Sequence, residues 1–319
     1  MTTETSYDAI VLVSFGGPEK RDDVLPFLDN VLRGRSVPEA RKLEVAEHYY
    51  HFNGVSPINQ LNREMIAALR QVLADRDIHL PIYFGNRNWD PLLADTFAGM
   101  RDDGIKRAMA LVTSAFGSYS GCRQYQEDIE TARATVDRAP AVDKLPLFWD
   151  SDGFITAAAD RLREALDALA TSDVRVAFTA HSIPRTMSEV SPYEAQLTAA
   201  CKAVAGRCEQ PSWDLVYQSR SGPPSQPWLE PDICDHLEAI AGNCSAAVIH
   251  PIGFLSDHLE VLYDLDTEAR EVCDRLNLNM IRAGTVGDHP ALIGALADLI
   301  QNHLDPTVPV PSCPVGCCL

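Results

Sequence analysis

Five carboxylate side chains recur at helical spacing in one stretch of the chain, directly after an apolar strand predicted at residues 246–249. They are Asp257, Glu260, Asp264, Glu268 and Glu271, each three or four residues from the next. Such a row either faces solvent on a helix or supplies hard oxygen ligands to a divalent metal ion. Open α/β sheets bind their ligands beyond the carboxyl ends of their strands, so the position of the row favours a metal.

His181 lies at the end of another predicted strand, in the motif A-H-S-I-P at residues 180–184. A lone histidine at a strand end is more often an ordinary hydrogen-bonding residue than a ligand or a base. If its strand neighbours the strand before the acidic row, His181 shares a sheet edge with Glu260. Imidazole beside carboxylates suits Fe²⁺ or Zn²⁺, and imidazole also accepts protons near neutral pH. No H-E-x-x-H or paired C-x-x-C motif occurs, which argues against a closed structural zinc site.

Other polar motifs follow predicted strands in the first half of the chain. The motif S-F-G-G-P at residues 14–18 forms either a tight turn or a place where the backbone approaches a flat ligand, since glycine has no Cβ. It lacks the G-x-G-x-x-G spacing of a dinucleotide site. Arg33, Arg35 and Arg87 add guanidinium groups, and residues 117–125 add hydroxyls. Because guanidinium groups bind carboxylates in a bidentate manner, these motifs together predict a pocket for an anionic ligand.

Strands and helices alternate along the chain, which predicts a doubly wound α/β fold with parallel sheets. Apolar runs predict buried strands at residues 9–13, 82–84, 108–112, 174–179, 215–217 and 247–252. Amphipathic segments predict helices at 59–73, 123–136, 154–169, 193–203, 233–241, within 251–268, and at 290–303. We expect one domain at residues 1–148, completed by a helix at 288–304, a second at 149–287, and a Pro- and Cys-rich tail at 305–319.

The composition predicts a globular protein that binds no nucleic acid. Asp and Glu (45) outnumber Lys and Arg (27), and the formal net charge of −18 is the opposite of the basic surface that nucleic-acid binding needs. The same charge repels anions, so an anionic substrate requires local arginines. The chain has no run of about twenty apolar residues that could form a transmembrane segment. Its first residues also lack the pattern of a secretion signal, so we expect a cytoplasmic location.

The ordered motifs resemble those of one enzyme family. They are S-F-G-G-P at Ser14, R-G-R at Arg33, N-G-V-S-P-I at Asn53, G-N-R-N-W at Gly85, S-Y-S-G-C-R-Q-Y at Ser118, A-H-S-I-P at Ala180, Y-Q-S-R-S-G-P at Tyr217, P-W-L-E-P at Pro227 and G-F-L-S-D-H-L-E-V-L-Y-D at Gly253. From about residue 7 to 303 the chain resembles the ferrochelatases, class II chelatases that insert Fe²⁺ into a porphyrin. The resemblance implies two Rossmann-like doubly wound domains with a porphyrin cleft between them.

The resemblance also implies roles for individual residues. His181 and Glu260 correspond to the catalytic pair, and Asp264 and Glu268 extend this pair into an Fe²⁺-binding line on a helix with π character. The residues implied in porphyrin binding are Phe15, Arg33, Arg35, Tyr49, Ser56 and Tyr125, the last five for the propionates. Many family members have a tyrosine where this chain has Phe15, and phenylalanine has no oxygen with which to bind the metal.

Several motifs are most similar to those of the soluble ferrochelatases that convert coproporphyrin III into coproheme in haem b biosynthesis. Coproporphyrin has four propionates, which suits an arginine- and hydroxyl-rich pocket, and protoporphyrin IX is the alternative substrate. The resemblance further implies transient contacts with other enzymes of haem biosynthesis. Two rival interpretations stay open: a chelatase for another metal or tetrapyrrole, such as a cobalt chelatase, and a haem- or porphyrin-binding protein without turnover.

Nine cysteines in a chain without an export signal argue against a disulfide framework. Cys313, Cys317 and Cys318 lie close together near the C-terminus. They resemble the set with which some ferrochelatases bind a [2Fe–2S] cluster, with Cys122 or Cys208 as the fourth ligand. The alternative is a thiol-rich tail that binds metal adventitiously.

Overall fold

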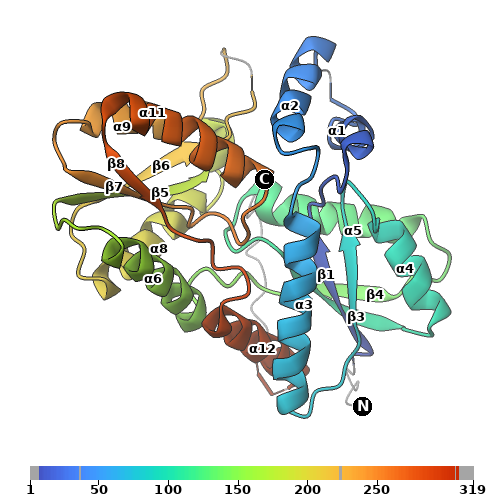
Figure 1. Ribbon diagram of the computed structural model, residues 1–319. Coiled ribbons are helices and arrows are strands. Elements are labelled where there is room, and N and C mark those ends of the chain that lie inside the picture. The colour runs from blue at the N-terminus through green and yellow to red at the C-terminus, as the bar shows by residue number, and fades with distance from the viewer. Residues whose placement is uncertain (1–6, 36, 223–224, 306, 309–319) are drawn as a thin grey trace. The chain divides into compact units, whose positions relative to one another are not determined.

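The computed structural model describes residues 7–35, 37–222, 225–305 and 307–308. It has an α/β fold with two four-stranded sheets in which every strand pairing is parallel (Figure 1). This is the predicted fold class. Within the described residues, no helix is both long and apolar enough to span a membrane.

The strands fall into two groups of four along the chain. They are β1 (Ala9–Ser14), β2 (Ile82–Asn86), β3 (Arg107–Val112) and β4 (Ala141–Lys144) in the first sheet, and β5 (Val174–His181), β6 (Trp213–Gln218), β7 (Ala246–His250) and β8 (Asn279–Arg282) in the second. Their spatial orders are β2-β1-β3-β4 and β6-β5-β7-β8. Each sheet therefore has its earliest strand in the interior, with the next strand on one side and the later two on the other.

Helices connect the strands and include two π-helical turns. The α-helices are α1 (Val24–Val31), α2 (Glu39–His51), α3 (Ile58–Asp75), α4 (Leu93–Asp102), α5 (Gln124–Ala134), α6 (Asp152–Asp167), α7 (Arg185–Ser188), α8 (Tyr193–Arg207), α9 (Ile233–Ile240), α10 (Leu259–Val261), α11 (Ala269–Leu276) and α12 (Pro290–Leu304). The shorter turns are the 3₁₀ turn η1 (Arg21–Asp23) and the π-helical turns η2 (Tyr119–Arg123) and η3 (Leu262–Glu268).

The chain forms two compact units, each built around one sheet. Within the described residues, the first unit runs to Thr113 and also includes Arg123–Pro146 and the chain from Leu296 to Val308. The second includes Ser114–Cys122 and Leu147–Ala295. The C-terminal half of α12 thus belongs to the first unit, where it is held by an Arg76–Asp298 ion pair of 2.6 Å.

The two central strands of the first sheet, β1 and β3, are buried because helices cover both faces. Every residue of β1 is buried, as expected for a continuous apolar run in a parallel sheet. On one face, Val11 and Ala110 pack in a common core with Phe97 of α4 and Ile129 of α5. The helix α3 covers the other face (Figure 1).

The second sheet is covered in the same way. The helices α6 and α8 contact β7 and β6, and α9 and α11 lie on the opposite side of the sheet (Figure 1). Under α9 and α11, Ala247 and Ile249 of β7 share a core with Val261, Leu265 and Leu237. The helix that follows β7 is therefore anchored to the sheet by its buried face.

Some predicted boundaries are wrong. The strand predicted at 247–252 ends at His250, and the helix predicted within 251–268 begins only at Leu259. Residues 251–258 form a loop, because proline and glycine at 251 and 253 disfavour a helix there. The sequence pattern also misses β4 and β8, since each has four residues, only one of them fully buried, at the edge of its sheet.

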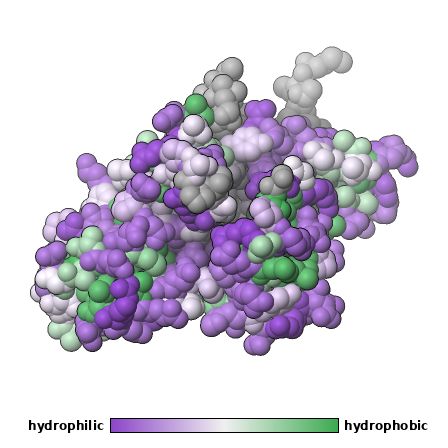
Figure 2. Space-filling model, turned by 90° about the horizontal axis from the view of Figure 1, so that it is seen from above, coloured by the Kyte–Doolittle hydropathy of each residue, from purple (hydrophilic) through white to green (hydrophobic). Residues whose placement is uncertain are grey.

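Polar residues dominate the surface seen from above in Figure 2, with smaller apolar areas between them. The large apolar side chains that are exposed in the described residues are Val37, Leu43, Val55, Val190 and Val308. Scattered exposed apolar side chains of this kind are normal for a globular protein.

Candidate active site

Neighbouring strand ends bring the functional side chains to one edge of the second sheet. β5 ends at His181 and β6 ends at Gln218, and these two residues are partners in the parallel register. On the other side of β5, β7 ends at His250 and the chain continues into the helix that carries Glu260. This edge holds the carboxyl ends of the strands, where α/β sheets bind their ligands.

His181 is oriented so that one ring nitrogen faces the acidic helix. Its Nδ1 lies 2.5 Å from the carbonyl oxygen of Ser182. Because a carbonyl can only accept, Nδ1 carries a proton, and the neutral ring has its lone pair on Nε2. Nε2 lies 3.8 Å from Oε2 of Glu260, and both side chains are partly exposed (34% and 45%). The predicted pair is therefore brought together, with a lone pair and a carboxylate facing each other.

Glu260 is placed by the start of its helix, and a second histidine caps that start. Nδ1 of His258 accepts a hydrogen bond of 3.2 Å from the backbone N–H of Glu260, which satisfies a donor that the helix itself leaves unpaired. Burial lowers the pKa of His258. Glu260 raises this pKa by a smaller amount, and His181 lowers it further by a still smaller amount. His258 is thus kept neutral beside Glu260 near pH 7.

The π-helical turn η3 keeps the acidic side chains in line. Glu260, Asp264 and Glu268 are four residues apart, and each precedes a residue of the buried row Val261, Leu265, Ala269. In an α-helix, residues at this spacing drift by about 40° around the axis at each step. A π turn has more residues per turn and reduces that drift. Because the π turn is wider than an α-helical turn, the apolar row of Val261, Leu265 and Ala269 can stay buried along its length. The adjacent row of carboxylates can then stay aligned beside it.

Asp264 is held by two neutral donors at the end of β6. The Ser219 hydroxyl donates to Oδ2 of Asp264, and Gln218 Nε2 donates to the same oxygen at 3.2 Å. The carboxyl group is half-buried, and this loss of hydration raises the pKa of Asp264 to about 7. Glu260 and Glu268 contribute to this raised value, whereas the two hydrogen bonds oppose it. Asp264 can therefore take up and release a proton near neutral pH.

The acidic row of the sequence divides in the structure. Asp257 forms an ion pair of 2.8 Å with Arg282 rather than joining the line at Glu260. Arg282 also binds Asp266, at 2.7 Å. Glu271 lies beyond η3 and is exposed. Within the acidic row, the charge of Asp257 is thus compensated by Arg282. The part from Glu260 to Glu268 includes the carboxylate that faces His181.

Four residues were implied as Fe²⁺ ligands, and the structure does not gather them into a closed metal site. In the part of the chain that the structure describes, no group of three or more His, Cys, Asp or Glu side chains is arranged to hold a metal ion. His181 and Glu260 face each other, and Asp264 and Glu268 follow along η3.

The residues implied in porphyrin binding all lie in the first unit. Arg33 and Arg35 follow α1 and are exposed, and Arg33 Nη2 donates to Asn30 Oδ1 at 2.5 Å. Ser56 is buried, and its backbone N–H donates to the carbonyl oxygen of Pro18 at 2.8 Å. The S-F-G-G-P turn and the loop after α2 are thus joined, while the two guanidinium groups remain accessible to an anion.

Aromatic rings surround Phe15 at the end of β1. Phe15 and Trp89 each make an edge-to-face contact with Phe27, with ring centroids 6.1 and 6.4 Å apart. Tyr49 is buried against the same Phe27 ring at 5.6 Å. Phe15 itself is partly exposed. This cluster offers an apolar surface next to the glycine turn, as a flat ligand requires.

Arg87 does not contribute the third anion-binding guanidinium that the sequence pattern indicates. Its side chain is only 7% exposed and pairs with Asp128 at 2.5 Å. It also lies over the ring of Tyr125, with 4.5 Å between the guanidinium carbon and the ring centroid. The prediction is wrong because Asp128 lies on α5, whose packing against this strand end the local sequence does not reveal. Arg87 instead fixes Tyr125 in the wall of the unit.

The comparison with protein families matches this chain to one family model, described as ferrochelatase, over residues 7–304. The chain belongs to the ferrochelatase family. A ferrochelatase of Rhodopirellula baltica is 51% identical, with 98% of this chain and 93% of the relative covered. Coproporphyrin III ferrochelatases of Nocardia farcinica and Mycolicibacterium smegmatis are each 48% identical and cover 95% and 94% of this chain and 90% of their own lengths.

Solved structures with low sequence identity share the fold of this ferrochelatase-family chain. The structure of CbiX, described as the terminal enzyme of siroheme biosynthesis in denitrifying bacteria, has a TM-score of 0.57 at 12% identity and covers 93% of this chain and 100% of its own. SirB from Bacillus subtilis with Fe³⁺ also has a TM-score of 0.57, at 11% identity, and covers 96% and 100%. At these identities the likeness concerns the fold alone.

Of the five cysteines implied as candidate ligands of a [2Fe–2S] cluster, the structure describes only two, Cys122 and Cys208. Cys313, Cys317 and Cys318 lie outside the described residues. Cys122 is buried in η2. Cys208 follows α8, its thiol donates to the carbonyl oxygen of Ala159 at 3.3 Å, and burial raises its pKa. Cluster iron binds thiolates, and the identity of the fourth ligand stays a prediction.

The sequence analysis did not predict three residues that lie beside His181, Glu260 or Asp264 in the structure. They are Gln218 and Ser219, in the motif Y-Q-S-R-S-G-P, and His258, in the motif that begins at Gly253. The spacing of these residues alone indicates no role for them. The available signal was position: Gln218 ends a strand, and His258 directly precedes the first helical residue. Ser219 has φ = +60°, a left-handed conformation that non-glycine residues rarely adopt and that is often found at functional sites.

Proposed function

We propose that this protein is a coproporphyrin III ferrochelatase, which inserts Fe²⁺ into coproporphyrin III and releases two protons. The observation that carries the proposal is the His181–Glu260 pair, 3.8 Å apart at the sheet edge, with Asp264 behind Glu260 on the π-helical turn. Membership in the ferrochelatase family supports the same reaction.

The residues match the needs of this reaction. The porphyrin must lose two pyrrole N–H protons while Fe²⁺ exchanges water for ring nitrogens. The lone pair on His181 Nε2 can accept a proton, and the Glu260 carboxylate is a hard ligand that holds Fe²⁺ without trapping it as a thiolate would. Asp264, with its pKa raised to about 7, can pass protons onward along η3.

The choice of coproporphyrin III rests on two observations. Relatives named coproporphyrin III ferrochelatase are 43–48% identical to this chain, although one relative at 51% is named only ferrochelatase. In addition, Arg33 and Arg35 are exposed after α1, the helix whose Phe27 packs against Phe15, and they can bind propionates in a bidentate manner. Four propionates make more use of such groups than the two of protoporphyrin IX.

An anaerobic time course of the visible spectrum tests the proposal. Catalytic amounts of protein are mixed with Fe²⁺ and either porphyrin, and metallation is followed over many turnovers. We expect a higher kcat/KM for coproporphyrin III than for protoporphyrin IX. A preference for protoporphyrin IX would change the substrate, faster insertion of Co²⁺ than of Fe²⁺ would change the metal, and a single stoichiometric turnover would indicate a binding protein.

The proposal has further consequences for the protein's surroundings. A coproporphyrin III ferrochelatase acts in the cytoplasm and meets the enzymes that supply its porphyrin and consume its iron complex. Pull-down of such enzymes after crosslinking would test these contacts. The [2Fe–2S] cluster stays a prediction, and the visible spectrum of the protein as purified tests it, because a cluster gives a brown chromophore that the apoprotein lacks.

A further inference from the structure

Arg282, the last residue of β8, makes four hydrogen bonds that join three parts of the second unit. Its Nε and Nη2 donate to the two carboxylate oxygens of Asp266, at 2.9 and 2.7 Å. Its Nη1 donates to Asp257 Oδ1 at 2.8 Å and to the carbonyl oxygen of Ala283 at 3.3 Å. Only 13% of the side chain is exposed. The guanidinium group is therefore fixed from several sides at once.

The two carboxylates that Arg282 binds flank, along the chain, two of the residues implied as iron ligands, Glu260 and Asp264. Asp257 lies in the loop before α10, three residues before Glu260, and Asp266 lies in η3, two residues after Asp264. The hydrogen bonds of Arg282 include neither Glu260 nor Asp264. One buried cation thus holds both ends of this segment and leaves the carboxylates between them to other partners.

The segment needs such a restraint because it contains a π-helical turn. Isolated π turns are rare, and an α-helix is the usual alternative for the same backbone. If the π turn changed into an ordinary α-helical turn, the helix register would shift by one residue. The residues before the turn would then rotate by about 100° around the helix axis relative to the residues after it. A rotation of that size would carry Glu260 away from Nε2 of His181. A second link restrains the same helix, since Arg270 Nη1 donates to the carbonyl oxygen of Met280 in β8 at 2.7 Å.

We propose that Arg282 is a positioning residue for metal insertion, which holds the π-helical turn in the register that keeps Glu260 beside His181. The inference rests on the proposed ferrochelatase function. It requires a guanidinium group in particular, because a planar fork can bind both oxygens of Asp266 and still reach Asp257, whereas a lysine ammonium is a single point of charge.

Two variants test the proposal by separating iron handling from porphyrin binding. Arg282→Lys keeps the charge, and Asp266→Asn keeps the shape of the other partner. For each, we expect kcat/KM for Fe²⁺ to fall about 10- to 100-fold, with an unchanged Kd for coproporphyrin III measured by quenching of its fluorescence. Because both variants break the same contact, the double variant should be no worse than the worse single variant.

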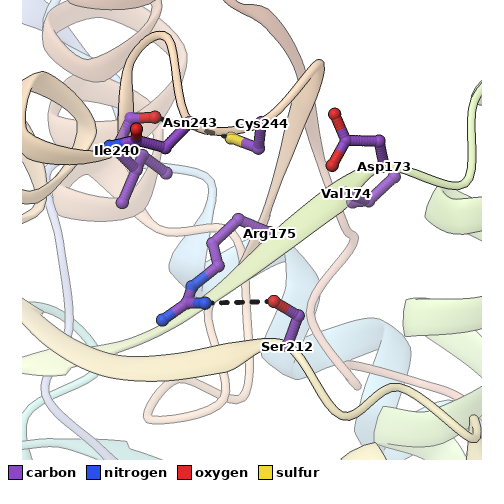
Figure 3. Close-up of a pocket in the computed structure, with 7 residues that line it drawn as sticks. All are labelled: Asp173, Val174, Arg175, Ser212, Ile240, Asn243 and Cys244. Carbon is purple, nitrogen blue, oxygen red and sulfur yellow. Dashed lines mark hydrogen bonds between the residues drawn. The ribbon is translucent and has the colours of Figure 1, made fainter.

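The chain offers a matched control in Arg175, which forms a similar fork in the same unit. Its Nε and Nη2 donate to the two oxygens of Asp214 at 2.6 and 3.0 Å. Its Nη1 donates to the Ser212 hydroxyl at 3.0 Å (Figure 3). Arg175 is six residues before His181 on β5, about 20 Å along the strand. Arg175→Lys should lower the melting temperature as Arg282→Lys does and leave the iron kinetics unchanged.

The outcomes distinguish this inference from the function on which it rests. Iron kinetics like those of the wild type in Arg282→Lys would overturn the role of Arg282, and so would an equal kinetic loss in Arg175→Lys, which would indicate general loosening of the unit. A parallel loss of porphyrin affinity would also overturn it. Absence of metal insertion by the wild type would contradict the proposed function itself, and this inference with it.

Discussion

Replacing His250 by glutamine should make the second unit less sensitive to acid. His250 is the last residue of β7 and is fully buried, and its Nε2 lies 2.9 Å from the carbonyl oxygen of Ala158 in α6. Since the carbonyl accepts, Nε2 carries the proton, and Nδ1 has no hydrogen-bond partner among the described residues. Protonation would therefore place an uncompensated charge in the core. Burial lowers the pKa of His250 from 6.5 to about 4.

The sign and size of the effect follow from these two pKa values. Between pH 6.5 and about 4, the unfolded chain binds a proton at His250 that the folded protein does not bind. The free energy of unfolding is thus unaffected by this group above pH 6.5 and decreases as the pH falls toward 4. The complete loss corresponds to about 3 kcal/mol, of which about 2 kcal/mol occurs between about pH 7.5 and about pH 5.

Hydrogen exchange of peptides from β5 and β7 measures this free energy in the second unit alone. His250→Gln still offers a donor to Ala158 but does not titrate, so its free energy of opening should fall by about 2 kcal/mol less than that of the wild type over the same pH range. Ile249→Val, at a buried neighbouring position, is the control and should cost about 1 kcal/mol at both pH values. Equal acid sensitivity of the wild type and His250→Gln would refute the argument.

The other predictions concern the reaction. Glu260→Gln or His181→Ala should lower kcat for metal insertion by about 100-fold or more, with intact porphyrin binding by fluorescence quenching; a loss of binding instead would assign these residues another role. Ser219→Ala removes a hydrogen bond that lowers the pKa of Asp264, so the acid limb of the pH profile of kcat/KM should move to higher pH, and an unmoved limb would exclude Asp264 from proton transfer. Arg33→Ala should raise KM for coproporphyrin III about fivefold, as for one exposed ion pair, and an unchanged KM would argue against a propionate contact.

The fold class could be predicted from the sequence because buried parallel strands have a distinctive pattern. The runs that became β1, β3, β5 and β7 are mostly apolar, since helices cover both faces of each sheet. The edge strands β4 and β8 have only one buried residue each and were missed for that reason, whereas the edge strands β2 and β6 were predicted. The start of the helix that carries Glu260 was predicted too early, because apolar spacing continues through the loop at 251–258, where proline and glycine prevent a helix.

The sequence by itself determined which side chains could do the chemistry: a histidine at a strand end and carboxylates at four-residue spacing are local features of the chain. Only the tertiary structure decided how these side chains are used. The pairing of β5 with β6 sets Gln218 beside His181, the buried row under η3 accompanies the π turn, and Arg282 selects Asp257 and Asp266 from among the carboxylates. The contacts of Arg282 alone join residues 16 and 25 positions apart. Their partners are chosen by packing and by the cost of burying an unpaired charge, and neither can be read from local spacing.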